Sequence, residues 1–404
     1  MQEILVEKPY QFIPPHRGNW CPSLIQRFNL YGMYLNHKEG VEDYELRNEH
    51  LLKQSLDAGH GIMLTPNHCR TSDPLVMGYL SRAVGCHLYS MASWHLFNQG
   101  WFNSWAIRLM GGFSVNREGI DRKSINTAID TLVTGERPLV IFPEGSTTRT
   151  NDHLHALLDG ISFIARTAAK KREKAKSGKV VVHPIALKYL FRGNLFETVD
   201  PILAQMEHRF TWKTQHEIGL IDRVTNIGMA ILALKELEYF GEVQSGSLKD
   251  RLKHLIDRLL GPLEQEWLGS EGSGLVVPRV KALRMNIMPE MVMDEISEEE
   301  RNRRWDHLRD IYLAQQISCY LPDYLAESPS IDRILETVER YEEDLTDKIT
   351  RHGSLKVILE VGEAIEVSSK RDKSLPTDPL MSQIELQLTT MMGDLAKESL
   401  PYQS

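Results

Sequence analysis

The chain has 404 residues, of which 42% are hydrophobic and 25% are charged, and a formal net charge of −8. These values are typical of a globular protein with a large core and more than one structural unit. Residues 1–200 carry 23 Lys and Arg against 19 Asp and Glu, whereas residues 201–404 carry 24 against 36. The overall acidity argues against nonspecific nucleic-acid binding, while the mildly basic first half suits an anionic membrane or a phosphorylated substrate.

Neither a membrane span nor a metal site is indicated. No stretch reaches the roughly 18 consecutive apolar residues of a transmembrane helix, and the acidic, polar amino terminus does not resemble a signal peptide. The four cysteines share no spacing typical of metal ligands or of a disulfide framework, and the fifteen histidines are scattered. We therefore expect a protein of a reducing compartment such as the cytoplasm, and no metal site.

The first sixty residues are predicted to contain an irregular segment, a short strand and a helix. Prolines interrupt residues 1–30, which we expect to be irregular, and the aromatic side chains there favour packing against the domain, with an acyl chain or a membrane as the alternative partner. A short strand is predicted over Tyr31–Leu35. Leucines at near-helical spacing predict a helix over Glu42–Asp57.

Strands and helices are predicted to alternate between residues 60 and 190. The expected strands cover 61–64, 87–91, 113–115, 138–142 and 179–189, and the expected helices cover 74–83, 96–110, 124–133 and 157–176. This alternation predicts an α/β class with a mixed, largely parallel sheet flanked by helices. The basic end of the last helix, within residues 166–179, favours a solvated face, with a membrane or phosphate contact as the alternative.

After residue 194 the pattern becomes helical, with examples over 248–267, 298–320 and 330–349. A β pattern returns at 354–367 and a final amphipathic helix is predicted over 378–397. The simplest organisation returns this last strand to the first sheet, so that the helical unit is an insertion. The predicted divisions are an irregular segment (1–30), an α/β domain (31–193), a helical insertion (194–350) and a returning strand with its helix (351–404).

His68 and Asp73 are the first candidate catalytic pair. His68 follows a short apolar run that is predicted to be a strand, and Asp73 lies five residues later, where a helix is predicted to begin. A carboxylate in this place can fix the tautomer of an imidazole whose other nitrogen takes a proton from a hydroxyl. Taken alone, the pattern also suits a histidine that caps the helix and an aspartate in solvent.

Two further charged residues follow predicted strands. Arg117 comes after 113–115, and Glu144 comes after 138–142. Open α/β sheets bind their ligands at the carboxyl ends of the strands, so we expect His68, Arg117 and Glu144 to gather at one edge. A surface ion pair for Arg117 and a turn cap for Glu144 are the competing interpretations.

Four blocks in order resemble the glycerolipid acyltransferase family, which includes 1-acylglycerol-3-phosphate and glycerol-3-phosphate O-acyltransferases. The blocks are N-H-C-R-T-S-D (67–73), G-F-S-V-N-R (112–117), F-P-E-G-S (142–146) and H-P-I-A (183–186). The resemblance covers about residues 30–192 and the strand near 355–367. It implies an acyltransferase with His68 as general base and Asp73 as its orienting partner.

The resemblance also implies a substrate site. Arg117 would bind the acceptor phosphate, for which a guanidinium is a natural bidentate partner, and Glu144 and Gly145 would shape the acceptor site. The other expected substrate-binding residues are Asn67, Ser146, Thr147 and Arg149. His183 in the fourth block is expected to be structural, and Cys69 is an unfavoured alternative nucleophile.

The family's third block usually continues with threonine and arginine directly after its glycine. Here Ser146, Thr147 and Thr148 intervene before Arg149. Either Arg149 reaches the same phosphate through a rearranged loop, or the acceptor differs. This departure leaves the acceptor open.

The resemblance implies acyl-CoA or an acyl carrier protein thioester as co-substrate, with no cofactor, and a phosphorylated glycerolipid acceptor such as lysophosphatidic acid or glycerol 3-phosphate in phospholipid synthesis. Another lysolipid or an aminolipid is the alternative acceptor. A non-catalytic acyl-binding or scaffolding protein is the alternative from a different class. The aromatic amino terminus and the basic helix are the expected membrane contacts, and nucleic acid is not an expected partner.

Overall fold

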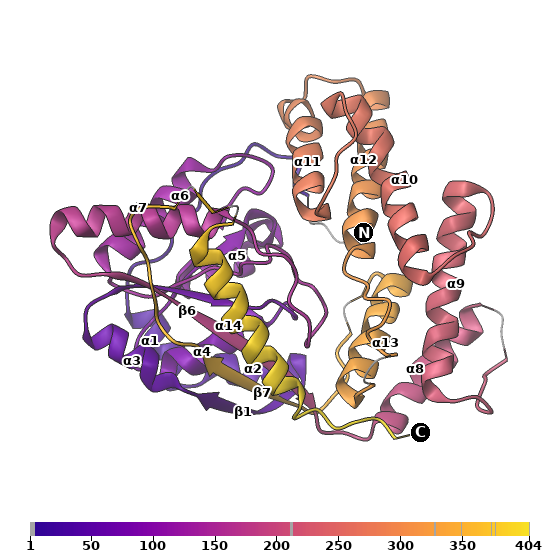
Figure 1. Ribbon diagram of the computed structural model, residues 1–404, viewed down its shortest axis with the longest axis horizontal. Coiled ribbons are helices and arrows are strands. Elements are labelled where there is room, and N and C mark those ends of the chain that lie inside the picture. Colours follow the sequence, from indigo (N-terminus) through magenta and orange to yellow (C-terminus); the bar gives the residue numbers. More distant parts are fainter. Residues whose placement is uncertain are drawn as a thin grey trace.

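An eight-stranded sheet carries the first and last parts of the chain (Figure 1). The computed structural model describes residues 5–210, 213–326, 329–348, 350–372, 374–375 and 377–403. The strands are β1 (Val41–Arg47), β2 (Gly61–Pro66), β3 (Tyr89–Ser93), β4 (Gly112–Val115), β5 (Leu139–Val140), β6 (Val180–Phe191), β7 (Leu355–Val361) and β8 (Ile365–Glu366). Their order is β1-β7-β6-β2-β5-β3-β4, and β8 pairs with β6.

The strands from β2 to β6 pair with one another in parallel, whereas β7 and β8 run antiparallel to β6. Every residue of β2 and of β6 is buried, as expected for apolar strands in the middle of a sheet that is covered on both faces. The predicted α/β class with a mixed, largely parallel sheet is therefore confirmed.

Helices flank the sheet, and α14 packs along β6 (Figure 1). In this part of the chain they are α1 (Trp20–Arg27), α2 (Leu30–Glu39), α3 (Glu49–Asp57), α4 (Asp73–Ala83), α5 (Trp101–Leu109), α6 (Arg122–Thr134), α7 (Gly160–Ala175) and α14 (Pro379–Ala396), with the 3₁₀ helix η1 (Trp94–Asn98) before α5. Among the described residues, no helix has both the length and the apolar composition needed to cross a bilayer.

The returning strand pairs with the first sheet, as the sequence predicted. β7 aligns with β6 from Val361 opposite Ile185 to Leu355 opposite Phe191. β1 then lies on the outer side of β7, with which it pairs in parallel. The strand that follows the helices is thus enclosed between two strands from the first half of the chain. The four domain boundaries themselves remain a prediction.

The helices between β6 and β7 form two groups. They are α8 (Leu195–Arg209), α9 (Leu220–Phe240), α10 (Leu248–Leu268), α11 (Val276–Met293), α12 (Glu298–Ile317) and α13 (Ile331–Thr346). Apolar side chains of α8, α13 and the start of α9 belong to the same core as the sheet. Helices α10, α11 and α12 pack around a separate core, joined by Leu232 at the middle of α9. Part of the helical unit is therefore continuous with the α/β layer.

Three expectations for the first half of the chain are wrong. The expected strand Tyr31–Leu35 lies in α2, because Tyr31 and Leu35 are buried on one side of a helix. The expected helix Glu42–Asp57 divides into β1 and α3 at Asn48, whose left-handed backbone (φ 58°) breaks the chain direction. Pairing with β7, more than 300 residues away, selects the strand over the local helical spacing. Residues 20–27, expected to be irregular, form α1.

Smaller differences occur farther along the chain. The helix expected over 96–110 is interrupted between η1 and α5, where Gly100 has a φ of 98°. The strand expected over 138–142 has only two residues in β5. The helix expected over 330–349 ends at Thr346, and Ile349 lies outside the described residues.

The basic end of α7 is only partly solvated. Arg172 is 2% exposed, and its guanidinium donates hydrogen bonds to the carbonyl oxygens of Val133 (2.8 Å) and Gly59 (2.5 Å). Lys171, its neighbour, has an exposed ion pair with Asp130. The arginine therefore satisfies carbonyl oxygens at the end of α6 and in the turn before β2, a role that the charge pattern does not predict.

Replacing Arg172 by alanine should destabilise the protein, because buried carbonyl oxygens lose their donors. We expect the free energy of unfolding to fall by about 2 to 4 kcal/mol. Lys171→Ala is the matched control, with an expected change within about 0.5 kcal/mol. Urea unfolding of the three proteins measures both values. Equal losses in both variants would show that Arg172 stabilises the fold no more than a surface cation does.

Candidate active site

The structure brings His68 and Asp73 together at the carboxyl end of β2. β2 ends at Pro66, the chain turns through His68, and Asp73 is the first residue of α4. His68 Nδ1 lies 2.8 Å from Asp73 Oδ2. The aspartate side chain is fully buried, while that of the histidine keeps 13% exposure. The imidazole is therefore the member of the pair that a substrate can reach.

Two further donors hold the Asp73 carboxylate. The backbone N–H of Arg70 donates to Oδ2 at 2.9 Å, and the hydroxyl of Tyr189 on β6 donates to Oδ1 at 2.6 Å. A carboxylate with these partners only accepts hydrogen bonds, so His68 Nδ1 is the donor in the pair. The neutral ring then carries its lone pair on Nε2, the form that a general base requires.

His68 Nε2 faces the loop that follows β5. Thr147 Oγ1 lies 3.3 Å from Nε2, and the imidazole ring packs on Phe142 with a centroid distance of 4.1 Å. The hydroxyl of Thr147 therefore lies within hydrogen-bonding distance of Nε2. The hydroxyl of an acceptor substrate can take the same position if it displaces the Thr147 hydroxyl.

Glu144 fixes the backbone of the dyad. Its Oε1 accepts from the N–H of His68 at 2.7 Å, and its Oε2 accepts from the N–H of His155 at 2.9 Å. The side chain is 2% exposed, and burial raises its pKa from the ordinary 4.5 to about 7. Glu144 thus connects the dyad turn to the loop that contains His155, and both of its oxygens accept hydrogen bonds from backbone N–H groups.

Gly145 and Thr148 complete this loop. Gly145 has a φ of 72°, and a Cβ there would meet the Leu158 side chain at 2.4 Å, so two constraints favour glycine. The backbone N–H of Thr148 donates to the carbonyl oxygen of His68 at 2.8 Å, and its hydroxyl donates to the same oxygen at 3.1 Å. The loop after β5 and the dyad turn are therefore joined in both directions.

Other expected binding residues have partners within the protein. Asn67 is 1% exposed and pairs its amide with the backbone of Leu187, accepting at 2.7 Å and donating at 3.1 Å. Arg149, with a φ of 63°, forms an ion pair with Glu343 of α13 at 2.7 Å. Ser146 is half-buried beside Thr147. Asn67 thus joins the dyad turn to β6, and Arg149 is directed toward the helical unit.

Arg117 lies in a group with two other side chains, His95 and Arg284. It follows β4, is half-buried, and its charge acts on His95 of η1 and on Arg284 of α11. Burial and these arginines lower the pKa of His95 to about 4, so it is neutral near pH 7. The sequence analysis missed His95 and Arg284. Arg284 carries no local signal, because the helical unit brings it here from far along the chain.

Cys69 and His183 have surroundings that suit structural roles. Cys69 is 3% exposed, and burial raises the pKa of its thiol well above the ordinary range, which disfavours the nucleophilic thiolate. His183 is fully buried, with its ring nitrogens 2.9 Å from Ser55 Oγ and from the carbonyl oxygen of Gly362. Within the described residues, no three His, Cys, Asp or Glu side chains are grouped to hold a metal ion.

The raised pKa of Glu144 predicts a pH-dependent stability. As the pH rises, this carboxyl ionises at a lower pH in the unfolded chain than in the folded protein. Its contribution to the free energy of unfolding is therefore fully present below about pH 4.5 and is lost as the pH rises through about 7. We expect the free energy of unfolding of the wild type, relative to Glu144→Gln, to fall by about 3 kcal/mol across this range. Denaturant unfolding at several pH values measures the difference. A constant difference would contradict the raised pKa.

Comparison with known proteins agrees with this geometry. Residues 44–188 match the model of a protein family described as Acyltransferase. No curated protein matches the sequence. The matched part includes the dyad, the Arg117 turn and the loop after β5, and it ends within β6. This match supports membership of the acyltransferase family, and acyl transfer as the general activity, for the part of the chain that carries the dyad.

Proposed function

We propose that the protein is an O-acyltransferase that uses a thioester of CoA or of an acyl carrier protein. The acceptor is the hydroxyl of a glycerol-phosphate-type molecule, lysophosphatidic acid or glycerol 3-phosphate, so the reaction belongs to phospholipid synthesis. The observation that carries this proposal is the buried Asp73 carboxylate paired with His68 Nδ1, which leaves Nε2 as the acceptor of a proton. The match to the acyltransferase family supports the same chemistry.

In this mechanism His68 acts as general base. Nε2 takes the proton of the acceptor hydroxyl as its oxygen attacks the thioester carbonyl, and Asp73 stabilises the imidazolium that forms. The tetrahedral intermediate collapses with cleavage of the C–S bond, and the thiolate receives the proton from Nε2. The thioester is already activated, so both substrates react in one ternary complex without a covalent enzyme intermediate, a metal or a cofactor.

Arg117 is the proposed partner of the acceptor phosphate. Its half-buried guanidinium lies near His95, which is neutral, and near Arg284, which is a second cation. Such a group favours a ligand with negative charge. The ion pair of Arg149 with Glu343 favours a second candidate, another lysolipid or an aminolipid, because this arginine is engaged by α13.

A cytoplasmic protein at the membrane surface fits a lipid acceptor. Several aromatic side chains of the first helices are exposed, Trp20 at 68% and Phe28 at 58%, whereas Tyr10 and Phe12 contact the α/β part through Ser114 and Phe113. We propose that Trp20 and Phe28 provide the membrane contact. A non-catalytic scaffold would have no need for an oriented dyad with one reachable nitrogen.

His68→Ala should lower the rate of acyl transfer by about 10²- to 10⁴-fold, the usual contribution of a general base. Cys69→Ala should retain most of the activity, because the buried thiol takes no part in the reaction. A thiol-release assay measures both, and circular dichroism checks that the variants are folded. Wild-type turnover in folded His68→Ala would exclude the dyad mechanism, and loss of activity only in Cys69→Ala would favour a thiol nucleophile.

Arg117→Ala should raise the KM for a phosphorylated acceptor by about 10- to 100-fold, the effect of losing charged hydrogen bonds to phosphate. The kcat should change much less. Arg122→Ala, which removes an exposed arginine five residues away, is the matched control. Steady-state kinetics with a phosphorylated acceptor and with an acceptor that has no phosphate separates the effect on KM from the effect on kcat. An unchanged KM for the phosphorylated acceptor in Arg117→Ala would favour an acceptor without a phosphate.

A further inference from the structure

A small buried cavity lies behind the dyad turn, against α13. Four arginines line it: Arg70 in the dyad turn, Arg149 in the loop after β5, Arg340 on α13, and Arg351 just beyond α13. The rest of the lining is Cys69 and the glutamates Glu336, Glu339 and Glu343. Its volume is about 10 Å³ for the centre of a water-sized sphere. A space of this size is about the smallest that holds one water-sized particle, so a phosphate group does not fit.

Positive charge exceeds negative charge around this cavity. Arg70 is paired with Glu339 at 3.0 Å and Arg149 with Glu343 at 2.7 Å. Arg340 instead donates to the carbonyl oxygens of Gln316 (2.5 Å) and Cys319 (3.2 Å). It thus brings a charge to the cavity that no carboxylate balances through these bonds.

The remaining carboxylates compensate weakly. Glu336 accepts hydrogen bonds from the Tyr324 hydroxyl and, at 3.1 Å, from the N–H of Asn151, and burial raises its pKa to about 8. It is therefore mostly neutral near pH 7. Arg351 is 3.5 Å from Glu39, and burial, together with the charges of Arg70 and Arg149, lowers its pKa to about 10. The part of this lowering that is due to Arg70 and Arg149 is a repulsion between cations.

Several guanidinium nitrogens at the cavity have no acceptor. The buried atoms without a hydrogen-bond partner among the described residues include Nη1 of Arg70, Nη1 of Arg149, Nε of Arg340 and Nη2 of Arg351. Buried N–H groups of cations are costly to leave unpaired. Four arginines around one small space, each with at least one such group, provide donors that an acceptor in the cavity would satisfy.

We propose that this cavity binds a small monovalent anion of the size of chloride. The anion would accept hydrogen bonds from the guanidinium groups and reduce the excess of positive charge. It would also join three segments, because Arg70 belongs to the dyad turn, Arg149 to the loop that carries Thr147, and Arg340 to α13. Since the backbone of Arg70 holds Asp73, the bound anion would steady the dyad turn. This site is separate from the proposed substrate sites.

Crystals of the full-length protein grown in sodium bromide test the proposal directly. We expect one anomalous peak in the cavity, within hydrogen-bonding distance of Arg340 and Arg351, and no such peak in Arg351→Met. Density for water alone, without an anomalous peak in the wild type, would overturn the proposal. The measurement does not depend on catalysis, so its failure would leave the proposed acyl transfer untouched.

Thermal unfolding provides a second measurement that needs no variant. At constant ionic strength, replacing sodium gluconate by sodium chloride at about ten times the dissociation constant should raise the midpoint of the wild type by about 2 °C. Arg309→Met, which removes an arginine whose side chain is 61% exposed, should keep this shift, and Arg351→Met should lose it. Equal midpoints of the wild type in both salts would contradict anion binding.

Discussion

The buried Asp73 carboxylate is the interaction on which the rest of the site depends. It receives hydrogen bonds from the imidazole of His68, the backbone of Arg70 and the hydroxyl of Tyr189. These donors come from the dyad turn and from β6, so one side chain sets the position of the turn relative to the sheet. A fully buried carboxylate is tolerated only when its oxygens have such partners. The arrangement holds the histidine ready before any substrate arrives.

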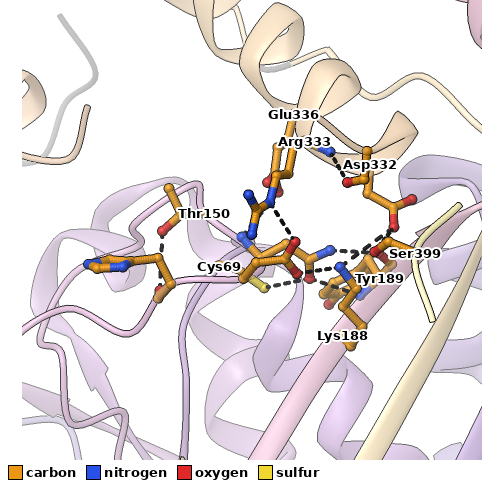
Figure 2. A network of polar contacts seen from close by, with 12 residues as sticks. Cys69, Thr150, Lys188, Tyr189, Asp332, Arg333, Glu336 and Ser399 are labelled. Atoms are coloured by element: carbon orange, nitrogen blue, oxygen red, sulfur yellow. Dashed lines mark hydrogen bonds and ion pairs between the residues drawn. The ribbon is translucent and has the colours of Figure 1, made fainter. Parts of the chain in front are cut away.

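The helical unit takes part in the same polar network. Figure 2 shows Asp332 on α13 near Lys188 on β6. On the same helix, Arg333 pairs with Asp152 at 2.9 Å and Glu336 accepts from the N–H of Asn151 at 3.1 Å. Lys188, with a side chain 1% exposed, is paired with Asp152 and lies 3.5 Å from Asp332. Removing α13 would leave this lysine with one carboxylate fewer in a buried place, which is strongly unfavourable. α13 is therefore not a removable addition to the α/β layer, and its Glu339 pairs with Arg70 in the turn that carries the dyad.

Local patterns predicted most of the α/β layer and both members of the dyad. The strand before His68 is a short apolar run, and a helix begins at Asp73, so the nearby sequence predicts where both residues lie. Their prediction as a catalytic pair rests in addition on the resemblance of four sequence blocks to a known family. The sequence predicts residues 42–47 as part of a helix because Leu46 continues the near-helical spacing of the leucines within 51–56. The strand β7, which makes them a strand, comes from far along the chain. The same limit applies to Arg149, whose partner Glu343 comes from α13, and to Arg284 of α11, whose neighbours are Arg117 and His95.

Acyl transfer in a ternary complex is the central claim, and it is tested most directly by a thiol-release assay with purified protein. Acyl-CoA and acyl carrier protein donors are crossed with phosphorylated and non-phosphorylated acceptors, and the acylated product is identified by mass spectrometry. The account predicts that thiol release depends on the acceptor and that the acyl group is found on its hydroxyl. Thiol release at the same rate without an acceptor, or no release with any pair of substrates, would contradict it.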